Sequence, residues 1–443
     1  MENLEISTTR KIRNRIIPFL VLLYVISFLD RVNLGYAALG MNKDLGLTAQ
    51  QYGLVAGIFF IAYFIFEVPS NMLLHRVGAR IWLARIIITF GIISAATAFV
   101  QNAAQLYTVR FLLGIAEAGF FPGVILYLTY WFRKKDRARA IALFMTGLGL
   151  SNIIGAPISG LILDHIHWAA LASWRWLYLF EGVPAIILGI ITIYILSDRP
   201  SDAKWLTDKE KAWLKDELER DNQGSDSVNH SHSLLSSLKV LLDGKVVLLA
   251  VVALCVNIGM YGLGFWMPQI IKGLSSMFSN TMVGFLTVIP YLIGCVAMVL
   301  NGRHSDLTSE RRYHSAIGPV IGALALLLLS FTTSPTLSIL LLTVTIAGLY
   351  SYYGPFFTLP TLFLREANAA VGIAAINSVG GLGGFFGPYI IGAVKSATGS
   401  VTSSLYVLAG ALVIACILLL TLKQEKAKET HLEQATNIEV GTV

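Results

Sequence analysis

Charge, cysteine and polar stretches are scarce in this sequence. Only 13% of the 443 residues are Asp, Glu, Lys or Arg, whereas an average soluble domain carries about 25%. The three cysteines, Cys255, Cys295 and Cys416, lie inside apolar runs, which indicates small core residues and not a disulfide framework. Together these shortages exclude a soluble enzyme, a disordered chain and a disulfide-stabilised scaffold.

Long apolar runs make up most of the chain instead. Hydrophobic residues account for 55% of the sequence. A bilayer-spanning helix needs about 20 apolar residues, and the runs that qualify are 16–39, 51–74, 82–101, 106–131, 138–163, 175–196, 243–271, 279–301, 313–333, 337–364, 368–394 and 402–422. Strands of a membrane barrel would alternate over about 10 residues, which these uniform runs do not do. The sequence therefore predicts an all-α polytopic membrane protein with twelve transmembrane helices.

Basic residues predict how the chain lies in the bilayer. The formal net charge is +7 and is spread over short loops, which favours the positive-inside bias of membrane proteins over nucleic-acid binding. The N-terminus, the loops around 76–80, 133–139 and 303–312, and the tail from 423 share one side. We therefore expect both termini to be cytoplasmic, with the protein in the cell membrane.

One long polar stretch divides the twelve runs into two groups of six. Thr207 to Glu210 forms a capping box, which predicts an amphipathic surface helix, and Asn222–Ser237 is typical of a flexible linker. His230 and His232 in that linker are expected to be solvated residues, not metal ligands. The predicted organisation is a six-helix bundle over 1–196, a cytoplasmic linker over 197–242, a second six-helix bundle over 243–422 and a cytoplasmic tail over 423–443.

Two landmarks recur at the same spacing in the two groups. His75 and Asp306, each in a basic loop after the second span of its group, are 231 residues apart, and so are Pro157 and Pro388 in the fifth spans. The spacing favours parallel structural repeats with a binding site where they meet at mid-membrane. The alternative is a coincidence of glycine and proline, which are common in membrane helices.

Four ionisable residues inside spans carry the chemical signal: Asp30, Arg31, Arg110 and Glu117. A charge at the bilayer centre costs roughly 2.5–3.5 kcal/mol, so it usually faces a cavity and a partner. Arg110 and Glu117 are two helical turns apart, which favours partners on the first span over each other. If a carboxyl takes a proton, a guanidinium fork becomes free to bind a carboxylate, so proton uptake and anion binding would reinforce each other. A static ion-pair network that holds the helices together is the alternative.

Other residues complete the predicted sites. Tyr63, Tyr261 and Asn377 are candidate substrate contacts. The candidate gating residues at the loop ends of spans are Arg76, Gly78, Arg80, Asp306, Arg311 and Arg312. The sequence shows no metal-ligand cluster, Walker motif or nucleophile elbow, so an enzyme, an ATP-driven pump, a metal and a cofactor are not expected.

Several longer motifs resemble one transporter family. The segments concerned are Phe28–Asn33, Arg110–Pro122, Trp174–Pro184, Asp198–Pro200 and Tyr261–Pro268. Asn71–Arg80 resembles the loop signature of the major facilitator superfamily, although His75 stands where an aspartate is usual, and Gly302–Arg312 resembles its second copy with Asp306 in place. The sequence is similar to the anion:cation symporter family of that superfamily, and in particular to carriers of tartrate, sugar acids and hydroxyphenylacetate.

The resemblance implies a two-bundle fold with alternating access, and a monomer. It implies proton coupling by Asp30 and Glu117, and a substrate and charge network that includes Arg31, Tyr63, Arg110 and Asn377. The predicted function is proton-coupled import of a small organic anion, such as a sugar acid or tartrate-like carboxylate, and an aromatic acid would suit the phenylalanine and tyrosine content about as well. Anion exchange or uniport on the same fold, and a membrane sensor that moves no ligand, are the alternatives.

Overall fold

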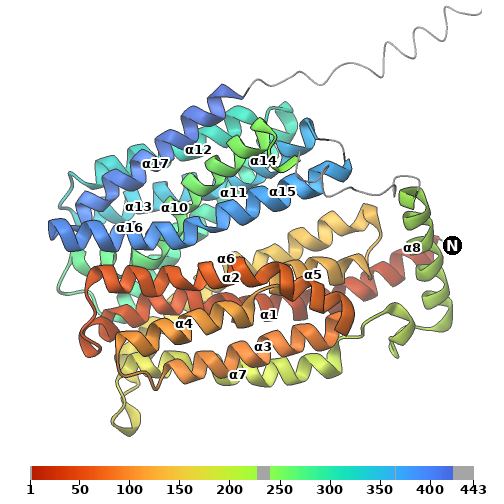
Figure 1. The fold of residues 1–443 in the computed structure, drawn as a ribbon, viewed down its shortest axis with the longest axis horizontal. Coiled ribbons are helices and arrows are strands. Elements are labelled where there is room, and N and C mark those ends of the chain that lie inside the picture. The colour runs from red at the N-terminus through yellow and green to blue at the C-terminus, as the bar shows by residue number, and fades with distance from the viewer. Residues whose placement is uncertain (1, 227–239, 365, 423–443) are drawn as a thin grey trace, which may run out of the picture.

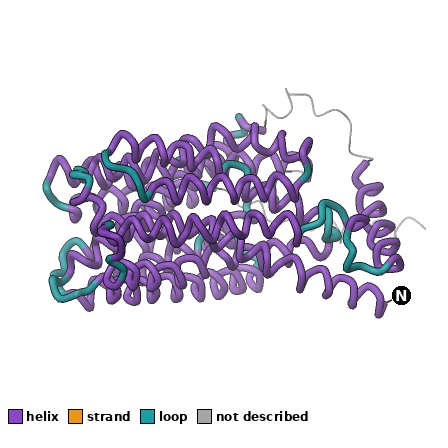
Figure 2. The backbone as a smooth tube through the Cα atoms, turned by 90° about the horizontal axis from the view of Figure 1, so that it is seen from below, coloured by secondary structure: helices purple, strands orange, loops and turns teal. Residues whose placement is uncertain are grey.

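The structure, a computed structural model, describes residues 2–226, 240–364 and 366–422, and the regular elements in these ranges are helices (Figure 2). The N-terminal half contains α1 (Glu2–Asp44), α2 (Ala49–Val77), α3 (Ala79–Thr97), α4 (Ala103–Glu117), α5 (Phe120–Thr129), α6 (Lys134–His165) and α7 (Ser173–Ile195). The surface helix α8 (Asp208–Asp226) follows. The C-terminal half contains α10 (Gly244–Leu274), α11 (Asn280–Thr308), α12 (Arg312–Leu329), α13 (Pro335–Ser351), α14 (Tyr353–Thr358), α15 (Glu366–Gly381), α16 (Gly383–Thr398) and α17 (Val401–Thr421).

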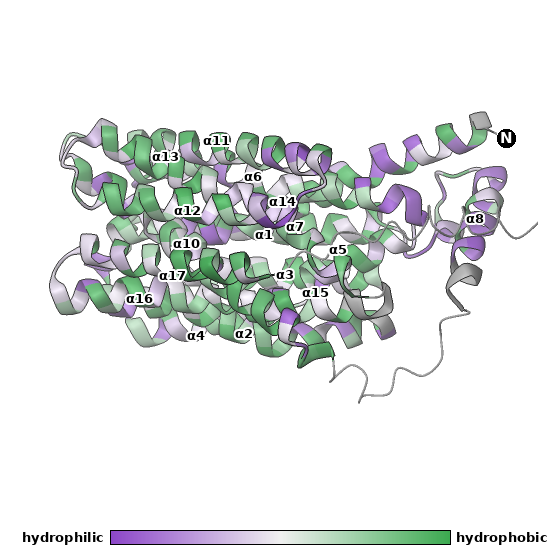
Figure 3. Ribbon diagram, turned by 90° about the horizontal axis from the view of Figure 1, so that it is seen from above, coloured by the Kyte–Doolittle hydropathy of each residue, from purple (hydrophilic) through white to green (hydrophobic). Residues whose placement is uncertain are grey.

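Within the described residues, twelve segments are long and apolar enough to cross a membrane, as the sequence predicted. Three of them are built from more than one helix: α4 with α5, α13 with α14, and α15 with α16. Apolar residues dominate these spans, while hydrophilic residues gather on α8 and on the start of α1 (Figure 3).

The first helix begins much earlier than the predicted run, at Glu2 instead of residue 16. Residues 2–15 contain neither glycine nor proline, so nothing stops the helix from extending beyond its apolar part. Ile12 is buried, and Lys11 forms an ion pair with Glu210 at 2.9 Å. This extension therefore packs against α8 and is part of the folded core.

The helix α8 starts at the predicted capping box. The backbone N–H of Thr207 donates to Glu210 at 2.8 Å, and that of Glu210 donates to the Thr207 hydroxyl at 3.3 Å. Burial alone would raise the pKa of Glu210, but the hydrogen bonds from Lys11 and Thr207 outweigh it, and the pKa lies below its ordinary value. Trp213 packs beneath the guanidinium of Arg133 at 4.9 Å, which ties α8 to the start of α6. The rest of the predicted linker, with His230 and His232, and the tail over 423–443 lie outside the described residues.

The two halves lie side by side, with α1–α7 below and α10–α17 above in Figure 1. Their internal packing is equivalent: α2 packs on α4 as α11 packs on α13, and α3 packs on α7 as α12 packs on α17. Two equivalent helix pairs join the halves, α2 with α16 and α6 with α11.

Glycines let these joining pairs approach backbone to backbone. A Cβ atom added to Gly53 would lie 2.5 Å from the carbonyl oxygen of Pro388, and one added to Gly284 would lie 2.5 Å from that of Ala156. Gly53 and Gly284 are 231 residues apart, the same offset as the predicted repeat. The two contacts are therefore equivalent positions of one repeated interface.

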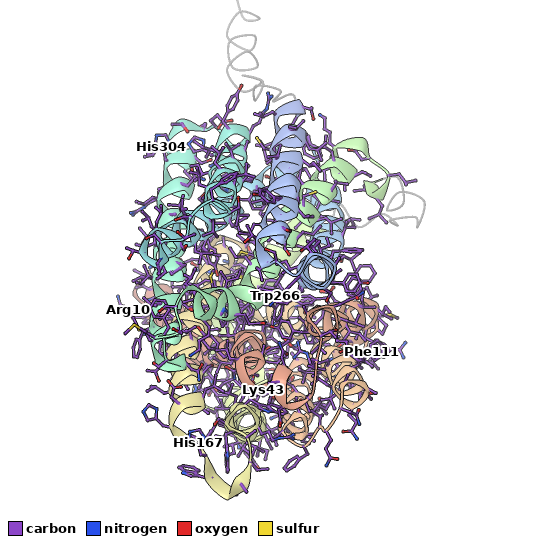
Figure 4. The ribbon with its side chains drawn as sticks, turned by 90° about the vertical axis from the view of Figure 1, so that its left-hand side faces the viewer. Arg10, Lys43, Phe111, His167, Trp266 and His304 are labelled. Atoms are coloured by element: carbon purple, nitrogen blue, oxygen red, sulfur yellow. The ribbon has the colours of Figure 1, made fainter. Side chains whose placement is uncertain are left out.

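The bundle has two chemically different ends. The basic end carries the start of α1, the loop between α2 and α3, the start of α6, and α8; the distal end carries Asp44, His165, Asn280 and Thr398. Hydrogen bonds join the halves near the distal end, such as those from Gln50 to Ser396 and from Thr281 to Asp164. Figure 4 looks onto this end, where Trp266 lies close to the boundary between the halves. The halves are closed against each other there.

Candidate functional site

The four ionisable residues singled out in the sequence form two ion pairs between α1 and α4. The guanidinium of Arg110 donates to the carboxylate of Asp30, and a terminal nitrogen of Arg31 lies 3.0 Å from an oxygen of Glu117. Neighbouring residues on a helix point about 100° apart, so Asp30 and Arg31 take partners at two different levels of α4. The expectation that Arg110 and Glu117 meet the first span, and not each other, is confirmed.

The two pairs differ in their access to the centre of the protein. The side chains of Asp30 and Arg110 are 0% exposed, and Arg110 also donates to the carbonyl of Val55 at 3.4 Å. Arg31 is 12% exposed and Glu117 is 3% exposed. A buried ion pair persists only where geometry and added hydrogen bonds offset its desolvation. The Asp30–Arg110 pair is enclosed, whereas Arg31 reaches a cavity.

Glu117 lies at a break in the fourth span. The helix α4 ends at Glu117 and α5 begins at Phe120, with Gly119 between them at a φ of +86°, a backbone conformation that favours glycine. A Cβ atom at Gly119 would lie 2.4 Å from the hydroxyl of Ser70, which itself donates to the carbonyl of Ala118 at 2.5 Å. The break was not foreseen from the sequence, although a glycine followed by Pro122 within an apolar run is a signal for one.

The break places the carboxylate of Glu117 at the end of a helix, where it needs stabilising partners. A carboxylate at the C-terminal end of a helix faces the negative end of the helix dipole. The hydroxyl of Ser27 donates to Glu117 at 2.7 Å, and Arg31 supplies the opposite charge on the same oxygen. The other oxygen of Glu117 has no hydrogen-bond partner among the described residues. Among the described residues, the carboxylate of Glu117 is thus held by side chains of α1 alone.

A cavity of about 70 Å³ lies between the two halves and is partly open to solvent. The N-terminal half contributes Arg31, Tyr36 and Asn152, and the C-terminal half contributes hydroxyl-bearing and aromatic side chains. Those that can donate or accept hydrogen bonds there are Tyr261, Thr287, Tyr291, Tyr350 and Tyr353. Arg31 brings a positive charge to a wall that is otherwise aromatic and hydroxylated. Such a wall suits a small anion that carries hydroxyl groups or an aromatic ring.

The other predicted substrate residues are placed differently. Tyr261 lines the cavity and packs against Phe60 at 4.8 Å between ring centres. Tyr63 lies outside the cavity wall, half-buried, with its ring 5.9 Å from that of Phe59. Arg110 is enclosed behind the wall, and Asn377 on α15 is exposed and does not line the cavity. Of the predicted contacts, Arg31 and Tyr261 are the two that reach it.

An amide other than Asn377 is built into the polar network near the cavity. Asn257 on α10 donates to the carbonyl of Gly380 at 2.9 Å and accepts from the hydroxyl of Tyr353 at 2.9 Å. It thereby fixes the orientation of a tyrosine that lines the cavity. Asn152, Tyr36 and Thr287, which also line it, carried no charge or motif that would single them out in the sequence.

The predicted gating residues make their contacts within their own halves. Arg80 binds Asp198 through its backbone N–H at 2.8 Å and its side chain at 3.5 Å, and Gly78, at a φ of +98°, leaves room for the same carboxylate.

In the C-terminal half Asp306 pairs with Arg311 at 2.6 Å, and Arg312 donates to a carbonyl of α17. Arg76 is exposed. In this conformation these residues brace each half, and a gating role stays a prediction.

A family model matches most of this architecture: residues 20–388 match the model described as "Major Facilitator Superfamily". The chain belongs to the major facilitator superfamily. The predicted superfamily and its fold with twelve candidate transmembrane helices are thereby confirmed.

Relatives within the superfamily are transporters by name. The chain is 47% identical to a protein of Agrobacterium vitis named "Putative tartrate transporter", over 97% of this chain and 94% of that protein. It is 39% identical to the "Quinolone resistance transporter" of Acinetobacter baumannii, over 96% of this chain and 98% of that protein. A solved structure of a bacterial homologue of the human lysosomal transporter Spinster, inward-facing and occupied, superimposes with a TM-score of 0.76 at 16% identity, covering 92% of this chain and 96% of that one. The chain is therefore a membrane transporter of this superfamily.

Proposed function

We propose that this superfamily member is a secondary transporter that couples proton uptake to the import of a small organic anion. The observation that carries the proposal is the Arg31–Glu117 pair, in which a cavity-facing guanidinium is held by a carboxylate with one unpartnered oxygen. A guanidinium binds carboxylates bidentately. The anion and Glu117 therefore compete for the same fork.

Protonation of Glu117 decides that competition. When Glu117 is ionised, Arg31 is neutralised and the wall of the cavity offers an anion no net charge. When Glu117 takes a proton, Arg31 is released and the anion binds where the carboxylate was. The Asp30–Arg110 pair, enclosed behind it, supplies a second carboxyl that can follow the same cycle once the helices move. Each step joins one proton to one anion-binding event, which is the requirement for symport.

Orientation and assembly form part of the same proposal. We place the basic end in the cytoplasm, because Lys and Arg concentrate in cytoplasmic loops of membrane proteins. The conformation described, closed at the distal end, is then closed to the outside. The cavity is completed by one chain, so we propose a monomer in the cell membrane.

Uptake into vesicles that hold the purified protein tests the proposal. The panel comprises tartrate, aldonates, hexuronates and hydroxyphenylacetate, each with and without an inward proton gradient. We expect one acid to accumulate only with the gradient, and Glu117→Gln to abolish that gradient-dependent accumulation. Accumulation that ignores the gradient in the wild type would contradict proton coupling.

The alternatives to symport give different results in the same vesicles. An exchanger or uniporter equilibrates the acid without the gradient and shows counterflow, whereas a sensor binds the acid and shows neither uptake nor counterflow. Export of a drug is the second candidate, because the Acinetobacter baumannii relative is named for quinolone resistance. It predicts that cells producing the protein accumulate less quinolone than cells producing the Arg31→Ala variant.

A further inference from the structure

A fifth ionisable side chain, Glu181 on α7, is buried beside the two ion pairs. Glu181 is 2% exposed, and the charges that act on it most strongly are those of Asp30, Arg110 and Glu117. Its sole hydrogen bond within the described residues comes from the neutral amide of Asn33, at 3.0 Å. The network of the N-terminal half therefore contains a third carboxyl.

The charges of this network do not balance when every member is ionised. Three carboxylates, on Asp30, Glu117 and Glu181, then face two guanidiniums, on Arg31 and Arg110. An unpaired charge that is taken out of water is far more costly than a neutral carboxyl, and such a group takes up a proton instead. One of the three carboxyls must hold a proton for the network to be neutral.

Contacts decide which carboxyl holds it. Asp30 and Glu117 each touch a guanidinium, which stabilises the ionised form. Glu181 touches only a neutral amide. Each of the three carboxyls has one oxygen without a partner among the described residues, so the contact of the other oxygen distinguishes them. We propose that Glu181 is a third proton-binding site of this transporter and that it is protonated in the conformation described here.

Among the described residues of the elements packed against α7, no cation faces Glu181. The helix α7 packs against α3, α1 and α6. At this level α3 presents Gly91 and Ala95 to the neighbouring Gly182, α1 presents Asp30 and Asn33, and α6 presents Ser159, whose hydroxyl donates to Asn33 at 2.7 Å. On α7 itself the nearby titratable group is the buried hydroxyl of Tyr178, and the cation one turn and a half away, Arg175, already binds Asp44 and two carbonyls.

A proton on Glu181 bears on the anion site. With it, the network is neutral and Arg31 can attract an anion once Glu117 is also protonated. Without it, the network carries one net negative charge that opposes the anion. The link from this proton to coupled transport rests on the proposed function, but the presence of the proton does not.

Infrared difference spectroscopy of the purified protein in lipid vesicles detects the proton directly, since a protonated carboxyl has a C=O band that shifts in D₂O. We expect that band in the wild type at neutral pH, its loss in Glu181→Gln, and its retention in Glu67→Gln, a control carboxyl on α2. Glu181→Asp keeps a carboxyl at the site and should shift the band without removing it, which keeps the test valid if Glu181→Gln does not fold.

Three results would overturn the assignment: a wild type without the band, a band that survives in Glu181→Gln, and a band unmoved in Glu181→Asp. The measurement needs neither substrate nor transport. If the vesicle uptake described above shows no proton coupling, the proposed function fails while the spectra still decide the state of Glu181.

Discussion

At the scale of single residues, the two ion pairs of the site look alike in sequence but differ in what removing one partner costs. Asp30 and Arg110 are fully enclosed, whereas Arg31, the partner of Glu117, lines a cavity. An enclosed charge that has lost its partner cannot be solvated by water. The same neutralising substitution should therefore have unequal effects at the two carboxylates.

We expect Asp30→Asn to lower the free energy of unfolding by about 3–5 kcal/mol, the usual cost of leaving one partner of a buried pair alone. Glu117→Gln should cost clearly less, because Arg31 can reach the cavity. Thermal unfolding of the purified variants measures both.

The double variant Asp30→Asn with Arg110→Gln is the matched control. It removes both charges and should recover part of the loss, as expected for residues in direct contact. Equal destabilisation by Asp30→Asn and Glu117→Gln would show that enclosure does not separate the two pairs.

Residue identity alone showed which side chains are out of place in a membrane, and the pairing across α1 and α4 followed from helical geometry. The sequence could not show which of these side chains faces the cavity, because that depends on how α1 is rotated against the C-terminal half. Asn377 illustrates the limit. Its amide lies in an apolar run, which is typical of a ligand contact, yet the side chain is exposed on α15. Asn257 instead forms the hydrogen bonds to Gly380 and Tyr353 near the cavity.

At the scale of elements, the helix α8 depends on one carboxylate. Glu210 closes the capping box and binds Lys11 of α1. Its pKa is lower in the folded protein than the ordinary value, so its contribution is complete above the ordinary value of about 4.3 and is lost as the pH falls through the folded value.

We expect Glu210→Gln to raise the hydrogen exchange of α8 amides about fivefold at pH 7, corresponding to about 1 kcal/mol. Well below about pH 4 the difference should vanish, since Glu210 is then neutral in the wild type as well. Comparing the two proteins at each pH cancels the intrinsic exchange rates. A difference that persists in acid would mean that the charge is not what holds the helix.

The distal closure also rests on a helix cap, supplied from the other half. Asp164 at the end of α6 accepts from the backbone of Thr281 at 2.7 Å and from the side chain of Asn280 at 2.8 Å, at the start of α11. At the equivalent place Ser396 accepts from the backbone of Gln50 at 3.0 Å. We call these hydrogen bonds, at Asp164 and at Ser396, the two polar latches. The acceptor is a charged carboxylate in the first latch and a neutral hydroxyl in the second.

Charge-assisted hydrogen bonds contribute roughly 1.5–3 kcal/mol and neutral ones about 0.5–1.5 kcal/mol. We therefore expect Asp164→Ala to speed hydrogen exchange in the first turn of α11 at least tenfold, and Ser396→Ala to have a smaller effect at the start of α2. Hydrogen exchange of both variants, measured by mass spectrometry, tests this order of effects. The reverse order would assign the closure to packing and not to the charged latch.

At the scale of the whole molecule, the two halves meet through glycines whose neighbours are backbone. We expect Gly53→Ala and Gly284→Ala each to force the distal ends apart, because the added carbon would lie 2.5 Å from a carbonyl oxygen of the other half. Gly273→Ala is the matched control, since nothing lies within 4 Å of that position.

Pairs of spin labels across the distal end, one on each half, measure the separation. The two interface variants should lengthen it and Gly273→Ala should not. If the distances in Gly53→Ala match those of the wild type, the contact is looser than its geometry requires.

The overall architecture was predictable because membrane helices are specified by length and hydropathy, and the 231-residue spacing pointed to a repeat. The breaks in spans four, ten and eleven were not, since a continuous apolar run does not reveal where backbone hydrogen bonds stop. The break at Gly119 depends on Ser70, which is far away in sequence. Ser70 leaves no room for a side chain at position 119, and its hydroxyl donates to the carbonyl of Ala118 at the break. Such a choice is made by a neighbouring helix and not by the local sequence.

The backbone contacts at Gly53 and Gly284 have a consequence for the speed of switching. Surfaces made of main chain have no rotamers to freeze when they meet and none to release when they part. Opening the distal end would therefore change side-chain entropy very little at these two contacts. If the distal end opens during transport, we expect the hydrogen bonds at Asp164 and Ser396 to set the barrier, so that a change at either residue alters the rate of opening without altering the fold.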